Sequence, residues 1–345
     1  SVYEAGLRIF GPPQAAAQLE SSKAFSKDFM ARHGIPTAAY ETFSDPAAAH
    51  AYVDRLGAPI VIKADGLAAG KGVVVAMTLQ EAHDAVDFML VDNKYGVTHN
   101  EGGARVVIEE FLEGEEASFI VLCDGKNVLA LATSQDHKRL KDGDEGPNTG
   151  GMGAYSPAPV VTADVHARAM REIILPTIRG MEKDGIPYTG FLYAGLMIDA
   201  KGHPKTLEFN CRMGDPETQP ILMRLKSDLF DVLGAGVDGK LDQIELQWDR
   251  RTALGVVMAA HGYPESPRKG DTITGLPAEA DDAVVFHAGT ALHDGVVSVT
   301  GGRVLCVTVL ADSVKLAQQR AYDVARGIHF DGAQYRRDIG FRAVK

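Results

Sequence analysis

The stretch KTLEFNCRMGDPETQ, residues 205–219, decides the predicted fold. Its first part alternates as a half-buried strand does, so the side chains of Glu208 and Asn210 are expected on one face. A carboxylate and a carboxamide oxygen placed in this way suit a hard cation such as Mg²⁺. Arg212 continues in the same phase and offers a fixed positive charge to a phosphate. Taken alone, the motif also fits an edge strand with solvated polar side chains.

Composition and net charge restrict the class of protein to which this stretch belongs. The chain has 345 residues, 45% hydrophobic and 23% charged, which indicates a globular protein of two or three domains. Its net charge of −11 argues against nucleic acid as the main partner, since a phosphate backbone requires a basic surface. A small anionic substrate stays compatible, because local lysines and arginines can outweigh the net charge.

Cysteine usage and hydropathy restrict the location. The three cysteines are widely spaced, which predicts neither a zinc site nor a disulfide framework. A reducing, cytoplasmic location is therefore expected. The sequence has no run of about 18 apolar residues, so no membrane span is predicted.

The pattern of elements predicts small mixed units of strands and helices. We expect helices over residues 22–34, 45–56, 78–90, 163–184, 220–234 and 314–326. We expect strands over residues 59–64, 72–76, 105–111, 117–122, 128–133, 190–199, 204–210, 253–260, 284–288, 295–300 and 303–310. Residues 135–156 are polar and glycine-rich, and we expect little secondary structure there. The last strands predict a compact, mostly antiparallel terminal domain.

A glycine-rich segment, DGLAAGKG at residues 65–72, is a candidate phosphate-binding hairpin. It is no Walker A loop, because the spacing differs and no Ser or Thr follows Lys71. Bare backbone N–H groups of such a hairpin can still cover phosphates, with Lys63 supplying a point charge. Lys23 lies in the first turn of a predicted helix, where the dipole disfavours a cation, and this placement suits a waiting anion. An ordinary hairpin tip and a solvated lysine are the alternatives.

The end of the strand at residues 105–111 is a candidate for binding the nucleoside. Backbone groups between Glu109 and Leu112 can read the edge of an adenine, and Glu116 is placed to accept bonds from ribose hydroxyls. The alternative is an acidic surface turn, EGEE at residues 113–116.

The order of these features resembles the ATP-grasp superfamily, in which two subdomains clamp ATP and a Glu-x-Asn strand binds its metal. Over essentially the whole chain, the local sequence motifs are similar to those of the phosphoribosylamine–glycine ligase family. The motifs that carry this resemblance are GLAAGKGV, TSQDHKR, GPNTGGMGAYSP, TGFLYAGLM and EFNCRMGDPETQP.

This resemblance implies an α/β (α+β) ATP-grasp fold with two subdomains clamping ATP and a small, mostly antiparallel C-terminal domain. The implied domains are residues 1–40 (the end of an amino-terminal domain and a linking helix), 41–112 (lid), 113–246 (central subdomain with the metal site) and 247–345 (C-terminal domain). The implied reaction joins glycine to 5-phosphoribosylamine through glycyl phosphate, with ATP and Mg²⁺ or Mn²⁺. A monomer without nucleic-acid or membrane partners is expected.

The resemblance also distributes roles over the candidate residues. For the nucleotide these are Lys23, Lys63, Gly66, Gly70, Lys71, Gly72, Glu109, Leu112 and Glu116. Glu208 and Asn210 are the metal ligands, and Arg212, Asp215 and Glu217 are the catalytic candidates, the last two for an amino group. His137 and Lys138 are candidates for substrate contacts.

The sequence departs from the family and superfamily pattern in two ways, and these departures leave alternative functions open. The family begins with a Rossmann-like domain, of which only the tail AGLRIFGP (residues 5–12) corresponds to this sequence. Other superfamily members often carry another metal-binding Glu on the neighbouring strand, where residues 191–196 have no carboxylate. The alternatives are another ATP-grasp ligase or carboxylase-like enzyme, and a nucleotide-binding fragment without turnover.

Overall fold

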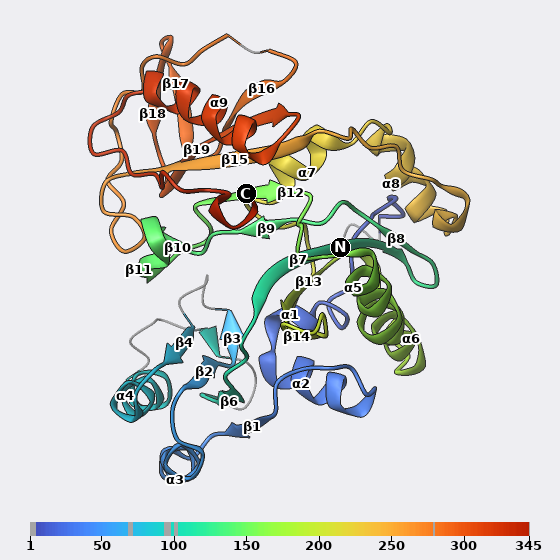
Figure 1. Ribbon diagram of the computed structural model, residues 1–345. Helices are drawn as coiled ribbons and strands as arrows, with labels where there is room; N and C mark the ends of the chain where they lie inside the picture. The colour runs from blue at the N-terminus through green and yellow to red at the C-terminus, as the bar shows by residue number, and fades with distance from the viewer. Residues whose placement is uncertain (1–4, 68–71, 93–97, 100–102, 279, 345) are drawn as a thin grey trace.

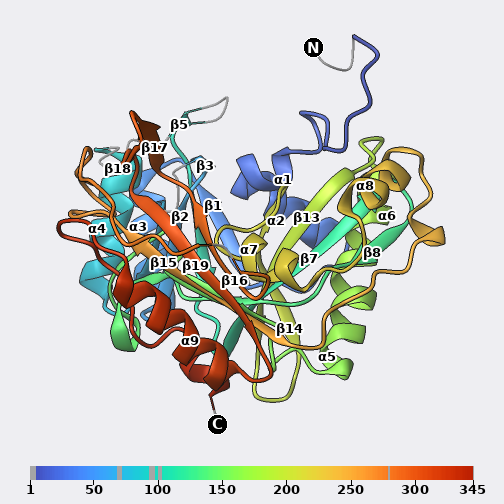
Figure 2. The ribbon, with the colours of Figure 1, turned by 90° about the horizontal axis from the view of Figure 1, so that it is seen from above.

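A computed structural model describes residues 5–67, 72–92, 98–99, 103–278 and 280–344 (Figure 1). Within these residues, strands and helices form three units that meet around one cleft. Figure 2, seen from above, separates the lid unit on the left from the central sheet on the right. None of the described helices has the length and apolar character needed to cross a membrane.

The lid unit is an antiparallel sheet in the order β1-β6-β2-β4, covered by two helices. Its elements are β1 (Tyr40–Phe43), α3 (Pro46–Leu56), β2 (Ile60–Ala64), β4 (Val73–Ala76), α4 (Leu79–Leu90) and β6 (Val106–Glu110), with a small pair of β3 (Gly66–Leu67) and β5 (Thr98–His99) beside them. Asp45 caps α3, and Thr78 with Glu81 forms a capping box on α4. The predicted small α+β subdomain is confirmed, and its role as a lid stays a prediction.

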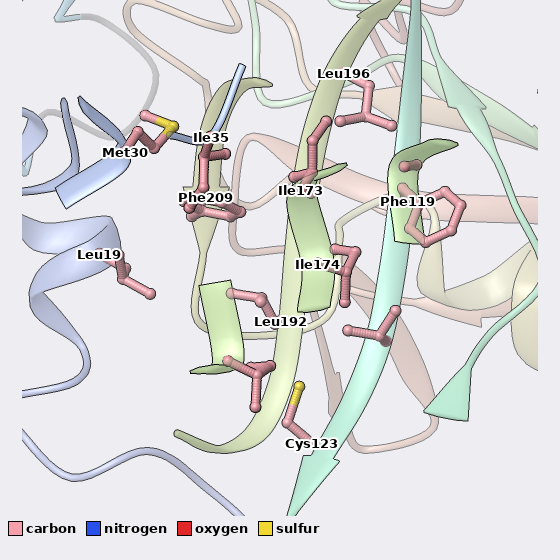
Figure 3. Close-up of a cluster of buried hydrophobic side chains, with 14 of the residues drawn as sticks. Leu19, Met30, Ile35, Phe119, Cys123, Ile173, Ile174, Leu192, Leu196 and Phe209 are labelled. Carbon is pink, nitrogen blue, oxygen red and sulfur yellow. The ribbon is translucent and has the colours of Figure 1, made fainter. Parts of the chain in front are cut away.

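The central unit is a sheet in the order β14-β13-β7-β8, with helices on both faces. Its elements are α1 (Gln18–Ser21), α2 (Lys23–Arg32), β7 (Glu115–Asp124), β8 (Val128–Ala130), α5 (Ala163–Arg168), the π-helix η2 (Ala169–Ile174), α6 (Leu175–Lys183), β13 (Thr189–Ile198), β14 (Pro204–Asn210), α7 (Thr218–Arg224), α8 (Leu229–Val237) and η3 (Leu241–Gln243). Figure 3 shows one face of this sheet, where Phe119, Leu192 and Phe209 pack against Ile173 and Ile174. The sheet is thereby fixed between two apolar layers, and its β14 edge can present polar side chains.

One predicted helix of this unit is wrong. Residues 220–234 were expected to be one helix, but α7 ends at Arg224 and α8 begins at Leu229. Between them the chain extends, because Lys226 N donates to Gln247 O at 2.8 Å and Asp228 caps the second helix. Hydrophobic periodicity continues through the break and hides it.

The C-terminal unit is a sheet in the order β16-β19-β15-β12-β9, covered by α9. Its elements are β9 (Gln135–Asp136), β10 (Arg139–Lys141), η1 (Asp142–Asp144), β11 (Glu145–Asn148), β12 (Gly153–Ser156), β15 (Thr252–Ala259), β16 (Ala283–His287), β17 (Thr290–His293), β18 (Val296–Val299), β19 (Arg303–Ala311), α9 (Val314–Gly327) and η4 (Phe341–Ala343). The sheet is antiparallel, as expected.

The expectation of little secondary structure over residues 135–156 is wrong. These residues hold β9 to β12, and β12 pairs with β15. Gly153 lies so close to the partner strand that an added Cβ would be 2.6 Å from Gly255 O. The glycines that suggested a loop therefore permit close strand packing. The pairing joins residues on both sides of position 247, and the predicted domain boundaries stay a prediction.

Candidate functional site

A cleft of about 1120 Å³ lies between the lid and central units, with C-terminal residues on its wall. Most of the predicted site residues line it: Lys23, Lys63, Gly66, Gly72, Glu109, Leu112, Glu116, Lys138, Glu208, Asn210, Arg212, Asp215 and Glu217. Gly70 and Lys71 lie outside the described residues. The features that were far apart in the sequence are thus brought to one cavity.

The predicted metal pair lies on β14, the edge strand of the central sheet. Glu208 pairs in register with Gly195 and Asn210 with Tyr193, so both side chains reach the cleft. Burial acts to raise the pKa of the Glu208 carboxyl, but lysine ammonium groups, Lys138 foremost, lower it below its ordinary value. The carboxylate is therefore ionised at neutral pH and is a hard oxygen donor.

A buried ion-pair cluster joins the lid to the central unit. The carboxylate of Glu109 lies 3.0 Å from the Nζ atoms of both Lys63 and Lys27. Lys63 Nζ also donates to Leu207 O on β14, at 3.1 Å. Burial is the main reason that the pKa of Lys27 falls to about 8.

The carboxylate of Glu109 is occupied by this ion-pair cluster. Glu109 lies inside the lid sheet, in register with both Tyr40 and Val61, and its side chain is 3% exposed. The predicted adenine contact concerns backbone groups between Glu109 and Leu112, and not this carboxylate. All four residues from 109 to 112 line the cleft, and the adenine contact stays a prediction.

The start of α2 is tied to the base of the glycine-rich hairpin. Asp65 accepts from Ser22 Oγ at 3.1 Å and from Ala24 N at 3.2 Å. Lys23 Nζ donates to Gly66 O at 3.1 Å, and burial lowers the pKa of Lys23. Lys23, which was predicted as a site residue from its position in the first helical turn, therefore lines the cleft.

Glu116 and Lys138 form an ion pair on the opposite wall, with 2.6 Å between Glu116 Oε2 and Lys138 Nζ. Burial acts to lower the pKa of Lys138, but Glu116, and after it Asp136, raise it well above its ordinary value. Lys138 is thus a permanent cation beside the metal pair.

The catalytic candidates occupy the turn after β14. Glu217 is 2% exposed and its Oε1 accepts from Ser118 Oγ and Tyr193 OH, both at 2.9 Å. Asp215 Oδ2 pairs with Arg303 at 2.8 Å. The two carboxylates differ in exposure. Asp215 is open to the cleft, whereas Glu217 is buried and held by hydrogen bonds from Ser118 and Tyr193.

Arg212 lies beside the predicted metal pair, and its side chain is 56% exposed. Its Nε donates to Glu20 at 3.0 Å, and a terminal nitrogen donates to Asn210 Oδ1 at 3.3 Å. The other terminal nitrogen donates to Met213 O at 3.1 Å, so all three guanidinium nitrogens are engaged, one of them with the oxygen predicted to hold the metal.

His137 contradicts its predicted role as a substrate contact. Its ring is 0% exposed, accepts from Gly340 N at 3.0 Å through Nε2, and lines no part of the cleft. Burial foremost, and then the charges of Arg342 and Arg336, lower the pKa of His137 to about 3. It is a neutral histidine of the core.

The neighbouring Asp136 is a site residue that the sequence reasoning missed. It lines the cleft, and its pKa is raised to about 7 by burial first and by Glu217 next, against the effect of Lys138. Strand alternation would have found it, because Asp136 and Lys138 share one face and His137 takes the other. Lys27 and Arg303 were also missed, and only the tertiary structure brings them to the cleft.

A pH prediction follows from His137. An unfolded imidazole binds a proton near pH 6.5 but the folded one only near pH 3, so between these values the unfolded state binds more protons. Stability from neutral His137 is present above this window and falls by roughly 1.4 kcal/mol per pH unit as the pH drops through it. His137→Gln should flatten the loss of unfolding free energy between pH 7 and pH 5, measured in urea. Exposed His329 provides the control as His329→Gln, and an unchanged slope in His137→Gln would refute the assignment.

Comparisons with known proteins agree with this geometry. The ATP-grasp (A) domain of phosphoribosylglycinamide synthetase matches residues 21–218, and the C domain of the same enzyme matches residues 253–342. A phosphoribosylamine–glycine ligase of Ralstonia nicotianae is 75% identical over 340 residues, which cover 99% of this chain and 80% of that relative. This chain belongs to the phosphoribosylamine–glycine ligase family.

Further relatives of the ligase family support the same conclusion. A Vibrio vulnificus ligase is 64% identical, covering 99% of this chain and 79% of its own length. The crystal structure of the Thermotoga maritima phosphoribosylamine–glycine ligase has a TM-score of 0.86 at 39% identity, covering 96% of this chain and 81% of that one. The ATP-grasp α+β fold and the glycinamide ribonucleotide synthetase activity, a step of purine biosynthesis, are therefore confirmed.

A more distant match shows the fold alone. The biotin carboxylase domain of a Hydrogenobacter thermophilus 2-oxoglutarate carboxylase, solved with MgADP and bicarbonate, has a TM-score of 0.71 at 18% identity. It covers 96% of this chain and 71% of its own length. ATP-grasp enzymes as a class use ATP with Mg²⁺.

Proposed function

We propose that the chain ligates glycine to 5-phosphoribosylamine through glycyl phosphate. A glycine carboxylate oxygen attacks the γ-phosphorus of ATP, and ADP leaves. The amine nitrogen then attacks the carbonyl carbon, loses a proton, and expels phosphate. The observation that carries this proposal is the single cleft that holds an ionised Glu208 beside Lys23, Lys63 and Lys138.

The residues present fit a magnesium ion. Glu208 and Asn210 offer one ionised carboxylate and one carboxamide from one strand face. Among the described residues no group of three or more His, Cys, Asp or Glu side chains forms a closed metal site. Mg²⁺ commonly takes one or two protein oxygens and completes its shell with phosphate and water. When bound, the ion would neutralise phosphate charge; we propose Mg²⁺ or Mn²⁺ for this role.

The cations around the pair have the task of positioning and neutralising phosphates. Phosphoryl transfer requires little covalent help, and charge stabilisation supplies most of the catalysis. Lys23, Lys63 and Arg212 would face the nucleotide, with Lys138 on the other wall. Enclosure in the cleft would keep water from the acyl phosphate.

Asp215 and Glu217 are proposed to hold the amino group of glycine or 5-phosphoribosylamine. Both line the cleft on the side of the turn after β14. Ser118 and Tyr193 fix one oxygen of Glu217, which limits its rotation. A carboxylate held in this way orients an ammonium group without moving toward it.

A coupled assay of ADP release tests the proposed function. ADP release should depend on both glycine and freshly made 5-phosphoribosylamine, and mass spectrometry should detect glycinamide ribonucleotide. Bicarbonate in place of glycine is the control for carboxylase-like chemistry. ADP release with bicarbonate and none with glycine would overturn the proposal. A monomer is expected and can be checked by sedimentation.

The ribose contact of Glu116 gives a separate prediction. Glu116→Ala should weaken ATP binding about tenfold or more, because a hydrogen bond to a charged group contributes roughly 1.5–3 kcal/mol. The KM for glycine should change far less. Calorimetry with ATP and with 2′-deoxy-ATP measures the effect. Lys138→Met is the companion variant, since it frees Glu116 from its 2.6 Å ion pair. Unchanged ATP affinity in Glu116→Ala would make it an ordinary surface carboxylate.

A further inference from the structure

Arg303, the first residue of β19, reaches the cleft from the C-terminal unit. One terminal nitrogen donates to Gly150 O at 2.7 Å and to Asp215 O at 2.9 Å. The other donates to Asp215 Oδ2 at 2.8 Å. One guanidinium therefore joins three segments that are distant in the sequence.

The segments meet with little space between them. A Cβ added to Gly150 would lie 2.8 Å from Arg303 Cζ, and one added to Gly151 would lie 2.4 Å from Pro216 Cδ. The two glycines thus let the loop before β12 pack directly on the guanidinium and on the turn after β14. Gly150 N is itself held by Tyr263 OH at 3.0 Å.

The two side chains of this ion pair differ in exposure. The side chain of Arg303 is 23% exposed and that of Asp215 is 57% exposed. An exposed ion pair alone contributes little to stability. Here, however, the arginine also holds the backbone oxygen of Asp215, so it fixes both the side chain and the turn that bears it.

We propose that Arg303 is a positioning residue for the ligation step. It holds the Asp215 carboxylate and the Gly150 loop as one wall, against which the amino group of a substrate is placed. This rests on the proposed function of Asp215. The C-terminal unit thereby contributes to the reaction, whereas the predicted metal pair and the cations Lys23, Lys63 and Arg212 belong to the other units.

The test compares Arg303→Gln with a matched control in the same unit. Arg320 also binds one carbonyl, Leu310 O at 3.2 Å, and one carboxylate, Asp282 at 2.8 Å, but it does not line the cleft. Arg303→Gln should lower kcat/KM for glycine or 5-phosphoribosylamine at least tenfold, with the Kd for ATP within twofold of wild type. Arg320→Gln should leave kcat/KM unchanged. Wild-type kinetics in Arg303→Gln, or an equal loss in ATP affinity, would overturn the proposal.

A second variant leaves the arginine in place. Gly150→Ala should displace the guanidinium and reproduce the loss, whereas Gly234→Ala, with nothing within 4 Å of its added Cβ, should not. A double-mutant cycle of Arg303→Gln with Asp215→Asn should be non-additive. If Asp215→Asn alone has wild-type kinetics, the proposed function of Asp215 fails. The positioning role of Arg303 falls with it, whereas an impaired Asp215→Asn together with a normal Arg303→Gln would overturn the Arg303 proposal alone.

Discussion

Glu208→Gln should lower kcat roughly 100-fold or more, the size expected when a group that stabilises transition-state charge is removed. Glutamine keeps the shape of the side chain but has no negative charge. In the wild-type protein, Lys138 and the other lysines keep the Glu208 carboxylate ionised. A contact made mainly in the transition state is lost in kcat, not only in KM. Steady-state kinetics at saturating ATP and glycine measure this loss, and circular dichroism checks the fold.

The control for this variant is another carboxylate on a strand. Glu41 lies on β1, is 55% exposed, and faces Arg55 at 3.8 Å, so Glu41→Gln should have wild-type kinetics. If a folded Glu208→Gln protein turned over at the wild-type rate, Glu208 would not be a metal ligand.

Lys63→Met should lower kcat/KM for ATP by about 100-fold, since it removes a charge from the proposed phosphate site. Lys27→Met provides the matched comparison, because both lysines lie 3.0 Å from the Glu109 carboxylate. Each variant leaves Glu109 with one buried cation, so both should lose a similar amount of stability. Lys27 also lines the cleft, but its Nζ is held by Thr37 Oγ1 at 2.7 Å and has no proposed phosphate contact, so only Lys63→Met should lose most of the activity.

Two measurements separate these effects. Urea unfolding gives the stability of each variant, and kinetics with varied ATP give kcat/KM. Equal losses of kcat/KM in Lys63→Met and Lys27→Met would contradict the phosphate role, and Lys63 would then serve only the cluster around Glu109.

Local patterns in the sequence were enough to predict that Glu208, Asn210 and most of the other candidate residues line one cleft. Glu208 and Asn210 were predictable because strand alternation fixes side-chain direction, and residues 208–210 keep that alternation after a register shift earlier in β14. Lys23 was predictable because a cation in a first helical turn is unfavourable without an anion. These residues depend on geometry within a few positions of the chain.

Other residues depend on contacts that no local pattern contains. The ion pairs of the Glu109 carboxylate are one example, because its two lysines come from α2 and β2. The core position of His137 depends on the pairing of β9 with β12, which is not visible in a glycine-rich stretch. Arg303 reaches the cleft from a different unit.

The most direct test of the central claim follows one oxygen atom. Glycine labelled with oxygen-18 in its carboxylate should transfer one labelled oxygen to phosphate in each turnover, because the oxygen that attacks ATP leaves with the phosphate. Phosphorus NMR of the released phosphate detects this transfer, and the same reaction without 5-phosphoribosylamine is the control. We expect labelled phosphate in step with glycinamide ribonucleotide. Unlabelled phosphate, formed at the same rate as the product, would contradict a glycyl phosphate intermediate.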